Sequence, residues 1–390
     1  MSVLGAAAIL VLAFAGANLD TFARPEQRGA EPNPAAAIPE GWTEFSPPPE
    51  TREGVSFIWA GSRLLAWGGC DPGGADPCEP TAGGFDFNPV TQSWRPLQPA
   101  PIAGADADVV WTGTEAIFLL EDENRLRGQA YDPASGTWRA ISTPPIAPRF
   151  GAVAVWTGSE VILWGGGNPE DPTVAEGAAY DPAGDTWRRI ARAPVGLNLA
   201  SGMWTGREML VFGSLLDDRN LADTRWSVGA AYDPGTDTWR ELPPSELSPQ
   251  ATSAVWVGDR AVAWDYEVHS QEYNADLNAW SPPVKMPLDF SECYPDSVVV
   301  RDFVFAFFCG HAALYDAHTA TWEEIHGGPL DEKVEFGGGS RTIELWRFAD
   351  LASTGDTVFM LAEGVTVNKG EVCYGCPGSP VSFWAFRPPA

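Results

Sequence analysis

Basic side chains are scarce in this sequence. It contains 24 Lys and Arg residues against 52 Asp and Glu residues, which gives a formal net charge of -28. Such a surface repels the phosphate backbone of nucleic acids, so we expect no nucleic-acid partner. Two interpretations of the acidic surface remain open. It either keeps the protein soluble as a monomer, or it attracts cations and basic partners.

Long runs with helical periodicity are also missing after the first twenty residues. The chain is rich instead in residues of strands and turns, with 18 Trp, 41 Gly and 35 Pro. This composition favours many short strands joined by turns. A length of 390 residues would permit two or three domains, but closed all-β architectures often exceed the usual domain size. We therefore expect one all-β domain with little helix.

The one long apolar run lies at the N-terminus. Residues 3–17 carry no charge, and Ala15 and Ala17 fit the small-residue pattern that precedes signal cleavage. The run is shorter than the roughly 20 apolar residues that a membrane span needs. We expect residues 1–17 to be a signal peptide, with a retained membrane anchor as the alternative. Residues 18–40, rich in Pro and Ala, are expected to form a linker without a fold of its own. The folded domain would then be extracellular or periplasmic, or membrane-anchored with the domain outside.

The cysteines are few and fall into local pairs. Six cysteines in an exported chain suggest disulfides that staple loops, although spacing alone does not fix their connectivity. Cys373 and Cys376 form a Cys-x-x-Cys motif of the kind found in redox and zinc sites, but no second motif or nearby histidine accompanies it. We therefore favour structural pairing and expect no metal and no cofactor. The expected pairs are Cys70 with Cys78, Cys293 with Cys309, and Cys373 with Cys376.

One motif recurs along the chain: an aromatic residue, then Asp or Asn, usually Pro, and a Trp seven positions after the aromatic. The steps between successive Trp residues run from 41 to 52 residues, which is the spacing of blades in a β-propeller. Asp-Pro makes a tight turn, because Pro fixes φ and Asp bonds its own backbone. The flanking strands form a hairpin with the two rings near its two ends, where they can pack between neighbouring blades. The copies begin at Phe87, Tyr131, Tyr180, Tyr232, Tyr273 and Tyr315.

A second hairpin precedes each of these copies. Its turn reads Trp-x-Gly, and the strand that follows is apolar at consecutive positions, as in residues 161–164. Both faces of such a strand must be buried, which happens when a blade lies between two others. Five such turns and two degenerate copies, near 304–308 and 358–361, give seven inner hairpins. The five turns begin at Trp59, Trp111, Trp156, Trp204 and Trp256.

Two strands at the ends of the repeat region lack partners. Residues 41–45 look like an outer strand without an upstream partner, and residues 381–386 have no downstream Trp. Pairing them would close the ring and leave only short, protected edges. We therefore predict a seven-bladed β-propeller over residues 41–390, with four-stranded antiparallel blades and an N-terminal strand completing the last blade. Trp42 should then lie close to Phe383.

The repeat resembles the kelch motif. The aromatic-Asp-Pro-to-Trp unit is combined with glycine pairs that end the second strand, at Gly68-Gly69 and Gly165-Gly166. The resemblance covers residues 41–390, and the loss of the double glycine from most copies marks a divergent member. It implies the propeller fold, with a distant likeness to the central domain of galactose oxidase. It leaves function open, because kelch propellers include binding scaffolds and enzymes.

In such blades the short turns gather on one face and the long connections on the other. Function usually sits on loops that a rigid scaffold positions, so we place the binding site on the long-loop face. The loops there are acidic, but none has the Asp-x-Asp-x-Asp-Gly pattern of a calcium loop, which leaves bound Ca²⁺ as a minor alternative. The long connections are residues 70–84, 167–177, 213–229, 326–340 and 364–380.

The mouth of the central channel offers a set of candidate ligand-binding residues. Position relative to the following turn selects Arg52, Asp106, Arg149, Asn198, Gln250, Asp296 and Arg347. Two or three arginines at a mouth could hold a carboxylate or an acidic glycan. They could equally pair with neighbouring acids, which is the interpretation that we favour.

The kelch resemblance also raises enzymatic alternatives. Galactose oxidases need two His, two Tyr and a Cys at copper, and the histidines of this chain lack the spacing of a metal clamp. A kelch-type sialic acid epimerase works by acid–base chemistry, for which Arg149, Arg347 and Asp106 would be the candidates. The chain lacks a sialidase box, a Gly-x-Ser-x-Gly elbow and a phosphate loop. The four histidines are His269, His311, His318 and His326.

We therefore predict an exported, non-catalytic propeller that binds a protein or glycan through its long-loop face. An extracellular carbohydrate-active enzyme of kelch type, epimerase-like or oxidase-like, is the alternative. The chain is expected to contact a membrane only through an N-terminal anchor.

Overall fold

The computed structural model describes residues 33–389, except 51, 71–78, 122–124, 168–172, 215–227, 249–252, 266–267, 288–295, 309, 332, 336–341, 345, 369–370 and 375–379. The predicted signal peptide and most of the predicted linker lie outside these residues. Within them, helix is confined to two short 3₁₀ turns, η1 (Pro34–Ala37) and η2 (Gly328–Asp331). No helix in this part of the chain is long and apolar enough to cross a membrane.

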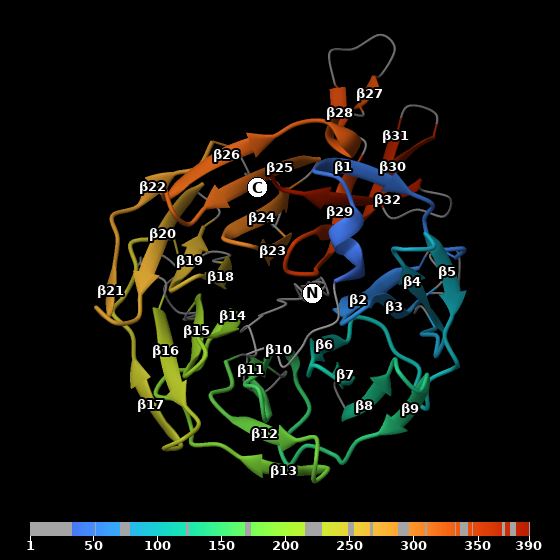
Figure 1. Ribbon diagram of the computed structural model, residues 1–390. Coiled ribbons are helices and arrows are strands. Elements are labelled where there is room, and N and C mark those ends of the chain that lie inside the picture. Colours follow the sequence, from blue (N-terminus) through green and yellow to red (C-terminus); the bar gives the residue numbers. More distant parts are fainter. Residues whose placement is uncertain are drawn as a thin grey trace, which may run out of the picture.

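Seven four-stranded antiparallel sheets follow one another around a ring, as Figure 1 shows. The first strand of each sheet is innermost and packs beside the first strand of the next sheet, from blade 1 round to blade 7 and back. The seven-bladed propeller predicted from the repeats is therefore confirmed.

The blades take their strands in chain order. Blade 1 contains β2 (Glu53–Ala60), β3 (Arg63–Cys70), β4 (Gly84–Asn88) and β5 (Ser93–Pro96), and blade 2 contains β6 (Asp108–Trp111), β7 (Ala116–Glu121), β8 (Leu126–Asp132) and β9 (Thr137–Ala140). Blade 3 contains β10 (Phe150–Trp156), β11 (Val161–Gly167), β12 (Gly177–Asp181) and β13 (Thr186–Arg189), and blade 4 contains β14 (Asn198–Trp204), β15 (Met209–Ser214), β16 (Val228–Asp233) and β17 (Thr238–Glu241). Blade 5 contains β18 (Ser253–Val257), β19 (Arg260–Trp264), β20 (His269–Asn274) and β21 (Ala279–Trp280), and blade 6 contains β23 (Asp296–Val300), β24 (Phe303–Phe308), β25 (His311–Asp316) and β26 (Thr321–Ile325). Blade 7 contains β29 (Trp346–Ser353), β30 (Val358–Asn368), β32 (Val381–Arg387) and β1 (Gly41–Phe45).

Blade 7 closes the ring with strands from both ends of the described chain. β1 pairs antiparallel with β32, so that Trp42 lies opposite Phe386 and Phe45 opposite Phe383. The rings of Phe45 and Phe383 are 5.8 Å apart, and Phe45 also contacts Phe87 of blade 1 at 5.3 Å. The predicted pairing of the two orphan strands is confirmed.

The end of the expected linker is ordered rather than unstructured. In η1, Ala35 is fully buried, and Asn33 donates a hydrogen bond to the backbone carbonyl of Thr354 in a short turn of blade 7. Arg387 donates to the carbonyls of Ala36 and Ile38. The folded part of the chain therefore begins before residue 41, because this segment covers apolar side chains at the seam of blades 7 and 1.

The outer hairpins follow the predicted turn chemistry, with one correction. Tyr180 and Trp187 lie directly opposite each other beside the turn, with ring centroids 4.9 Å apart, and not near the two ends of the hairpin. The indole of Trp187 also donates a 2.7 Å hydrogen bond to the carbonyl of Ser142 in blade 2. The same contact crosses the ring closure, where Trp94 donates to Ser46 at 2.9 Å. The predicted packing of these rings between blades is confirmed.

A polar network joins neighbouring blades near the short turns. Arg188 forms a bidentate ion pair with Glu160 and donates to the hydroxyl of Tyr232 in the next blade. Tyr232 in turn donates to Asp237 at 2.6 Å, and this hydrogen bond helps to lower the pKa of Asp237. Equivalent networks begin at Arg139 and Arg240. The bidentate pair, which is geometrically strict, fixes the arginine within its own blade, and the hydrogen bond to the tyrosine then joins that blade to the next.

Some of the expected loops form extra strands. β27 (Lys333–Glu335) and β28 (Thr342–Glu344) make a hairpin between blades 6 and 7, and β31 (Glu371–Tyr374) pairs with the extended end of β30. Figure 1 shows these strands projecting from the ring. A short β22 (Val284–Lys285) pairs with β20. Much of the expected loops 70–84, 167–177 and 213–229 lies outside the described residues.

Candidate functional site

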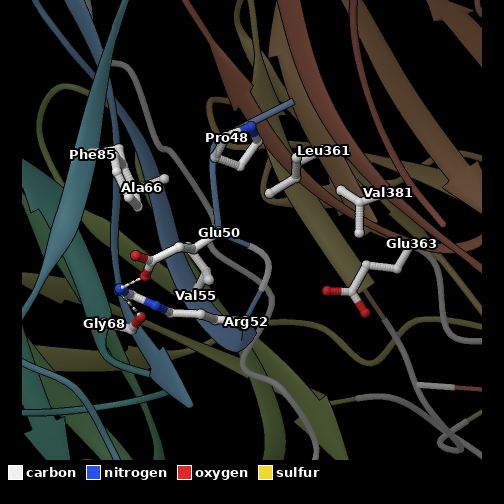
Figure 2. Close-up of a pocket in the computed structure, with 10 residues that line it drawn as sticks. All are labelled: Pro48, Glu50, Arg52, Val55, Ala66, Gly68, Phe85, Leu361, Glu363 and Val381. Carbon is white, nitrogen blue, oxygen red and sulfur yellow. Dashed lines mark hydrogen bonds and ion pairs between the residues drawn. The ribbon is translucent and has the colours of Figure 1, made fainter. Parts of the chain in front are cut away.

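A cleft opens between blades 7 and 1 on the long-loop face. The ends of β3 and β30 meet the starts of β2 and β32 there, as the side chains in Figure 2 show. The cleft is shallow: its roughly 360 Å³ of empty space includes open solvent, and the enclosed part, about 10 Å³, has room for about one water molecule. Its walls are formed mainly by Val55, Ala66, Phe85, Leu361 and Val381, and its charged residues are Glu50, Arg52 and Glu363.

Arg52 lies along the blade 1 side of the cleft. Its guanidinium donates to the Glu50 carboxylate and to the carbonyl of Gly68 at 3.4 Å, and it lies 5.7 Å from the centre of the Phe85 ring. The Arg52 side chain is 16% exposed, whereas that of Glu50 is 61% exposed. Among the described residues no ion pair joins Arg52 to Glu363 across the cleft (Figure 2). The one basic group of the lining is therefore already paired at the rim.

The blade 7 side of the cleft carries two carboxyl groups. Asp350 of β29 lies opposite Leu361 of β30, and Glu363 follows two residues later on the same strand. Side chains at directly paired positions, and at positions two residues apart, share one face of a sheet. Leu361 packs in the cluster between blades 7 and 1. Asp350 and Glu363 therefore both face blade 1.

Burial raises the pKa of both carboxyl groups. Burial, together with the nearby charge of Glu53, raises the pKa of Glu363 to about 7. Burial also raises the pKa of Asp350 well above its ordinary value, and the charges of Glu363, Asp296 and Asp106 add to this. These half-buried groups keep some contact with solvent but are surrounded by protein, which disfavours the charged form.

Two more acids approach Asp350 from neighbouring blades. Asp296 begins β23 of blade 6, and burial raises its pKa to about 7. Asp106 precedes β6 of blade 2, its pKa is also raised by burial, and its carboxylate lies against Gly54. The innermost strands of blades 6, 7, 1 and 2 thus concentrate carboxyl groups on one side of the axis.

A second set of acids lies at the seam between blades 2 and 3. Asp108 of β6 lies opposite Leu119, and Glu121 follows two residues later. Burial raises the pKa of Glu121 to about 7, opposed by a 3.3 Å hydrogen bond from the amide of Ala152 and by the charge of Arg149. Burial raises the pKa of Asp108 well above its ordinary value, and Glu121 adds to the rise.

Arg149 fills this second seam. Only 1% of it is exposed, and its guanidinium donates to the carbonyls of Ala147, Gly165 and Glu176 at 2.9, 3.0 and 3.1 Å. Burial lowers its pKa, while the charges of Glu121 and Glu176 raise it. The side chain thus holds two connections of blade 3 together and places a positive charge near the acids of blade 2.

The predicted mouth residues lie at different distances from the short turn that follows them in the chain. Arg52 and Arg149 both lie seven residues before the Trp of the following short turn, Trp59 and Trp156. Asp106 and Asp296 lie closer to their turns and share the neighbourhood of Asp350. Asn198 is the first residue of β14, and Arg347 the second of β29, both described by backbone alone. Gln250 lies outside the described residues.

Four residues of the candidate sites were not selected from the sequence. They are Asp108, Glu121, Asp350 and Glu363. The sequence pattern that could have indicated them is an acid in an apolar strand: the Asp lies three residues before the short turn, and the Glu is the sixth residue of the next strand. Only the pairing of the two strands shows that each Asp shares a face with its Glu.

The cleft contains two carboxylates and one guanidinium as its charged side chains. Its lining contains no serine, cysteine, histidine or lysine that could act as a nucleophile, and the described residues contain no group of three or more side chains that could hold a metal. A desolvated carboxyl with a pKa near 7 can instead be ionised and held by a cationic ligand. Among the predicted cysteine pairs, only Cys70 has a described side chain, and no described cysteine is free. The pairing therefore stays a prediction.

Comparison with known proteins adds no relative to this description. No protein-family model matches the chain, and no curated protein matches it. The fold therefore stands on the strand pairings themselves.

Proposed function

We propose that this chain is an exported, non-catalytic binding propeller of the kelch type that recognises a protein or glycan through its long-loop face. The observation that carries the proposal is the cleft between blades 7 and 1, where an apolar wall meets a half-buried acid that has no ion pair among the described residues. Pockets with apolar walls and a few convergent polar groups are the usual form of ligand sites.

The kelch assignment is supported by the roles of the motif residues. The glycine pairs at Gly68-Gly69 and Gly165-Gly166 all have positive φ, between 75° and 79°. A Cβ at Gly68 would lie 2.4 Å from the carbonyl oxygen of Gly104, so a side chain is excluded there. The Tyr–Trp pairs beside the Asp-Pro turns join blade to blade. The motif thus has a structural reason at each of its positions.

The proposed location outside the cytoplasm is supported by the sequence. The apolar run at residues 3–17 and the three local cysteine pairs are typical of exported chains. A formal charge of -28 supports a soluble monomer that avoids nucleic acid. We propose an extracellular or periplasmic location, with membrane contact only through a retained N-terminal segment.

Binding of the full chain to a glycan array and to a peptide array tests the proposal. Val381 lies at the rim of the cleft and Val90 in an outer turn of the opposite face. Val381→Trp should fill the cleft and abolish the binding that either array detects, whereas the matched control Val90→Trp should leave it unchanged. Silence on both arrays, or equal binding by wild type and Val381→Trp, would overturn the proposal.

A further inference from the structure

The two acid-bearing seams are copies of one arrangement. In each, an Asp lies opposite a Leu, with a Glu two residues beyond that Leu: Asp108 and Glu121 in blade 2, Asp350 and Glu363 in blade 7. In each, the next blade around the ring presents an arginine at the same strand position. These arginines are Arg149 in blade 3 and Arg52 in blade 1.

The two arginines even contact equivalent backbone groups. Ala152 lies opposite Gly165 in blade 3, and Val55 lies opposite Gly68 in blade 1. Arg149 donates to the carbonyl of Gly165 at 3.0 Å, and Arg52 donates to that of Gly68 at 3.4 Å. The seams therefore share backbone geometry, acid placement and the origin of the basic side chain.

They differ in whether the arginine fills the space before the acids. Arg149 is buried, and its charge lowers the pKa of Glu121. Arg52 is drawn to the rim by Glu50, and the space between Arg52 and Glu363 is the cleft. Among the described residues, the charge that shifts the pKa of Glu363 is that of another acid, Glu53. The guanidinium of Arg149 thus acts on the acid of the closed seam, whereas Glu50 and the carbonyl of Gly68 hold that of Arg52 on the blade 1 side of the open seam.

We propose that the open seam receives the guanidinium or ammonium group of a basic side chain from a protein partner. This inference rests on the proposed binding function and specifies the chemical class of its ligand. The cationic head group would lie near Glu363 and Asp350, where Arg149 places its charge in the closed seam. The stem of the side chain would pack against Leu361, Val381 and Phe85, as long basic side chains do on apolar surfaces.

Charge complementarity favours such a partner over a glycan acid. The acids Glu53, Asp106, Asp296, Asp350 and Glu363 surround the site. Against them stands Arg52, which Glu50 already neutralises. The net charge of -28 would also draw a basic protein toward this face before contact.

Peptides that differ only in charge test the inference. The full chain is titrated with fluorescent hexapeptides that carry one central Arg or Lys, and with matched peptides in which neutral citrulline replaces Arg. We expect the citrulline peptide to bind roughly tenfold more weakly, because a hydrogen bond to a charged group is worth about 1.5–3 kcal/mol. Equal affinity for Arg and citrulline, or no binding by any basic peptide, would overturn the inference.

A matched pair of variants locates the effect. Glu363→Gln should weaken the Arg peptide by roughly tenfold, whereas Glu121→Gln, the same change in the closed seam, should leave its affinity unaltered. If Glu363→Gln binds the Arg peptide as tightly as wild type, the cation subsite is refuted. If Val381→Trp still abolishes binding in that case, the binding function survives. If neither Glu363→Gln nor Val381→Trp changes the affinity, both the cation subsite and the binding function are refuted.

Discussion

Replacing Glu363 by Gln should stabilise the protein, and more so as the pH rises. The pKa of this glutamate is raised from its ordinary 4.5 to about 7 by burial in the cleft wall and by Glu53. Below pH 4.5 the residue is protonated in both folded and unfolded chains, so its burial carries no ionisation penalty. Above pH 7 it is ionised in both, and the folded state bears the cost of a desolvated charge.

The size of the effect follows from the shift. Each pH unit between the two pKa values corresponds to about 1.4 kcal/mol, so the rise from 4.5 to about 7 would give about 3 kcal/mol. Partial contact with solvent reduces this to about 2–3 kcal/mol. Glutamine keeps the shape of the side chain without the charge. The variant should therefore gain about 2–3 kcal/mol over wild type at pH 8 and almost nothing at pH 4.5.

Denaturant unfolding at pH 4.5, 6 and 8, followed by tryptophan fluorescence, measures this difference. The free-energy gap between wild type and Glu363→Gln should widen steadily with pH, and the exposed Glu44→Gln on β1 should show no such trend. A gap that stays constant with pH, or a variant less stable than wild type at pH 8, would show that Glu363 is not held in a desolvated environment.

Three other substitutions probe the architecture. Phe45→Ala should cost about 3–5 kcal/mol in denaturant unfolding, because it empties an aromatic cluster at the ring closure; a loss under 1 kcal/mol would mean that the closure does not limit stability. Trp187→Phe keeps an aromatic ring beside Tyr180 but removes the indole donor to Ser142, and should lower the unfolding free energy by at least about 1 kcal/mol with unchanged circular dichroism. Arg149→Met leaves the acids of the closed seam without their counter-charge, so it should destabilise by about 3–5 kcal/mol at pH 8 and less at pH 5, where Glu121 is protonated. Equal losses at both pH values would contradict that pairing.

The architecture was predictable because its determinants are local and repeated. Each Asp-Pro turn and each Trp-x-Gly turn defines a hairpin within a few residues, and the spacing of the copies sets the number of blades. The ring closure was also predictable, because the repeat pattern left two strands without partners, residues 41–45 and 381–386, and each could pair only with the other. The position of Tyr180 opposite Trp187 needed the actual register, which a turn motif leaves open by a residue or two.

The site was harder to predict because it depends on contacts between blades. Choosing mouth residues by distance from a turn assumes equal registers, yet β14 carries a register shift between Asn198 and Ser201. Arg52 and Arg149 occupy the same strand position but differ in burial, because Glu50 draws one of them to the rim. No local sequence pattern encodes that difference.

The pairing of β1 with β32 has a consequence for biosynthesis. β1 leaves the ribosome among the first of the described segments and β32 among the last, so the seventh sheet cannot be completed until residues 381–387 have been made. Until then the opening strand waits without its partner, and the apolar flanks of blades 1 and 6 stay open to solvent. The ring can therefore close only after residues 381–387 have been made and have paired with residues 41–45.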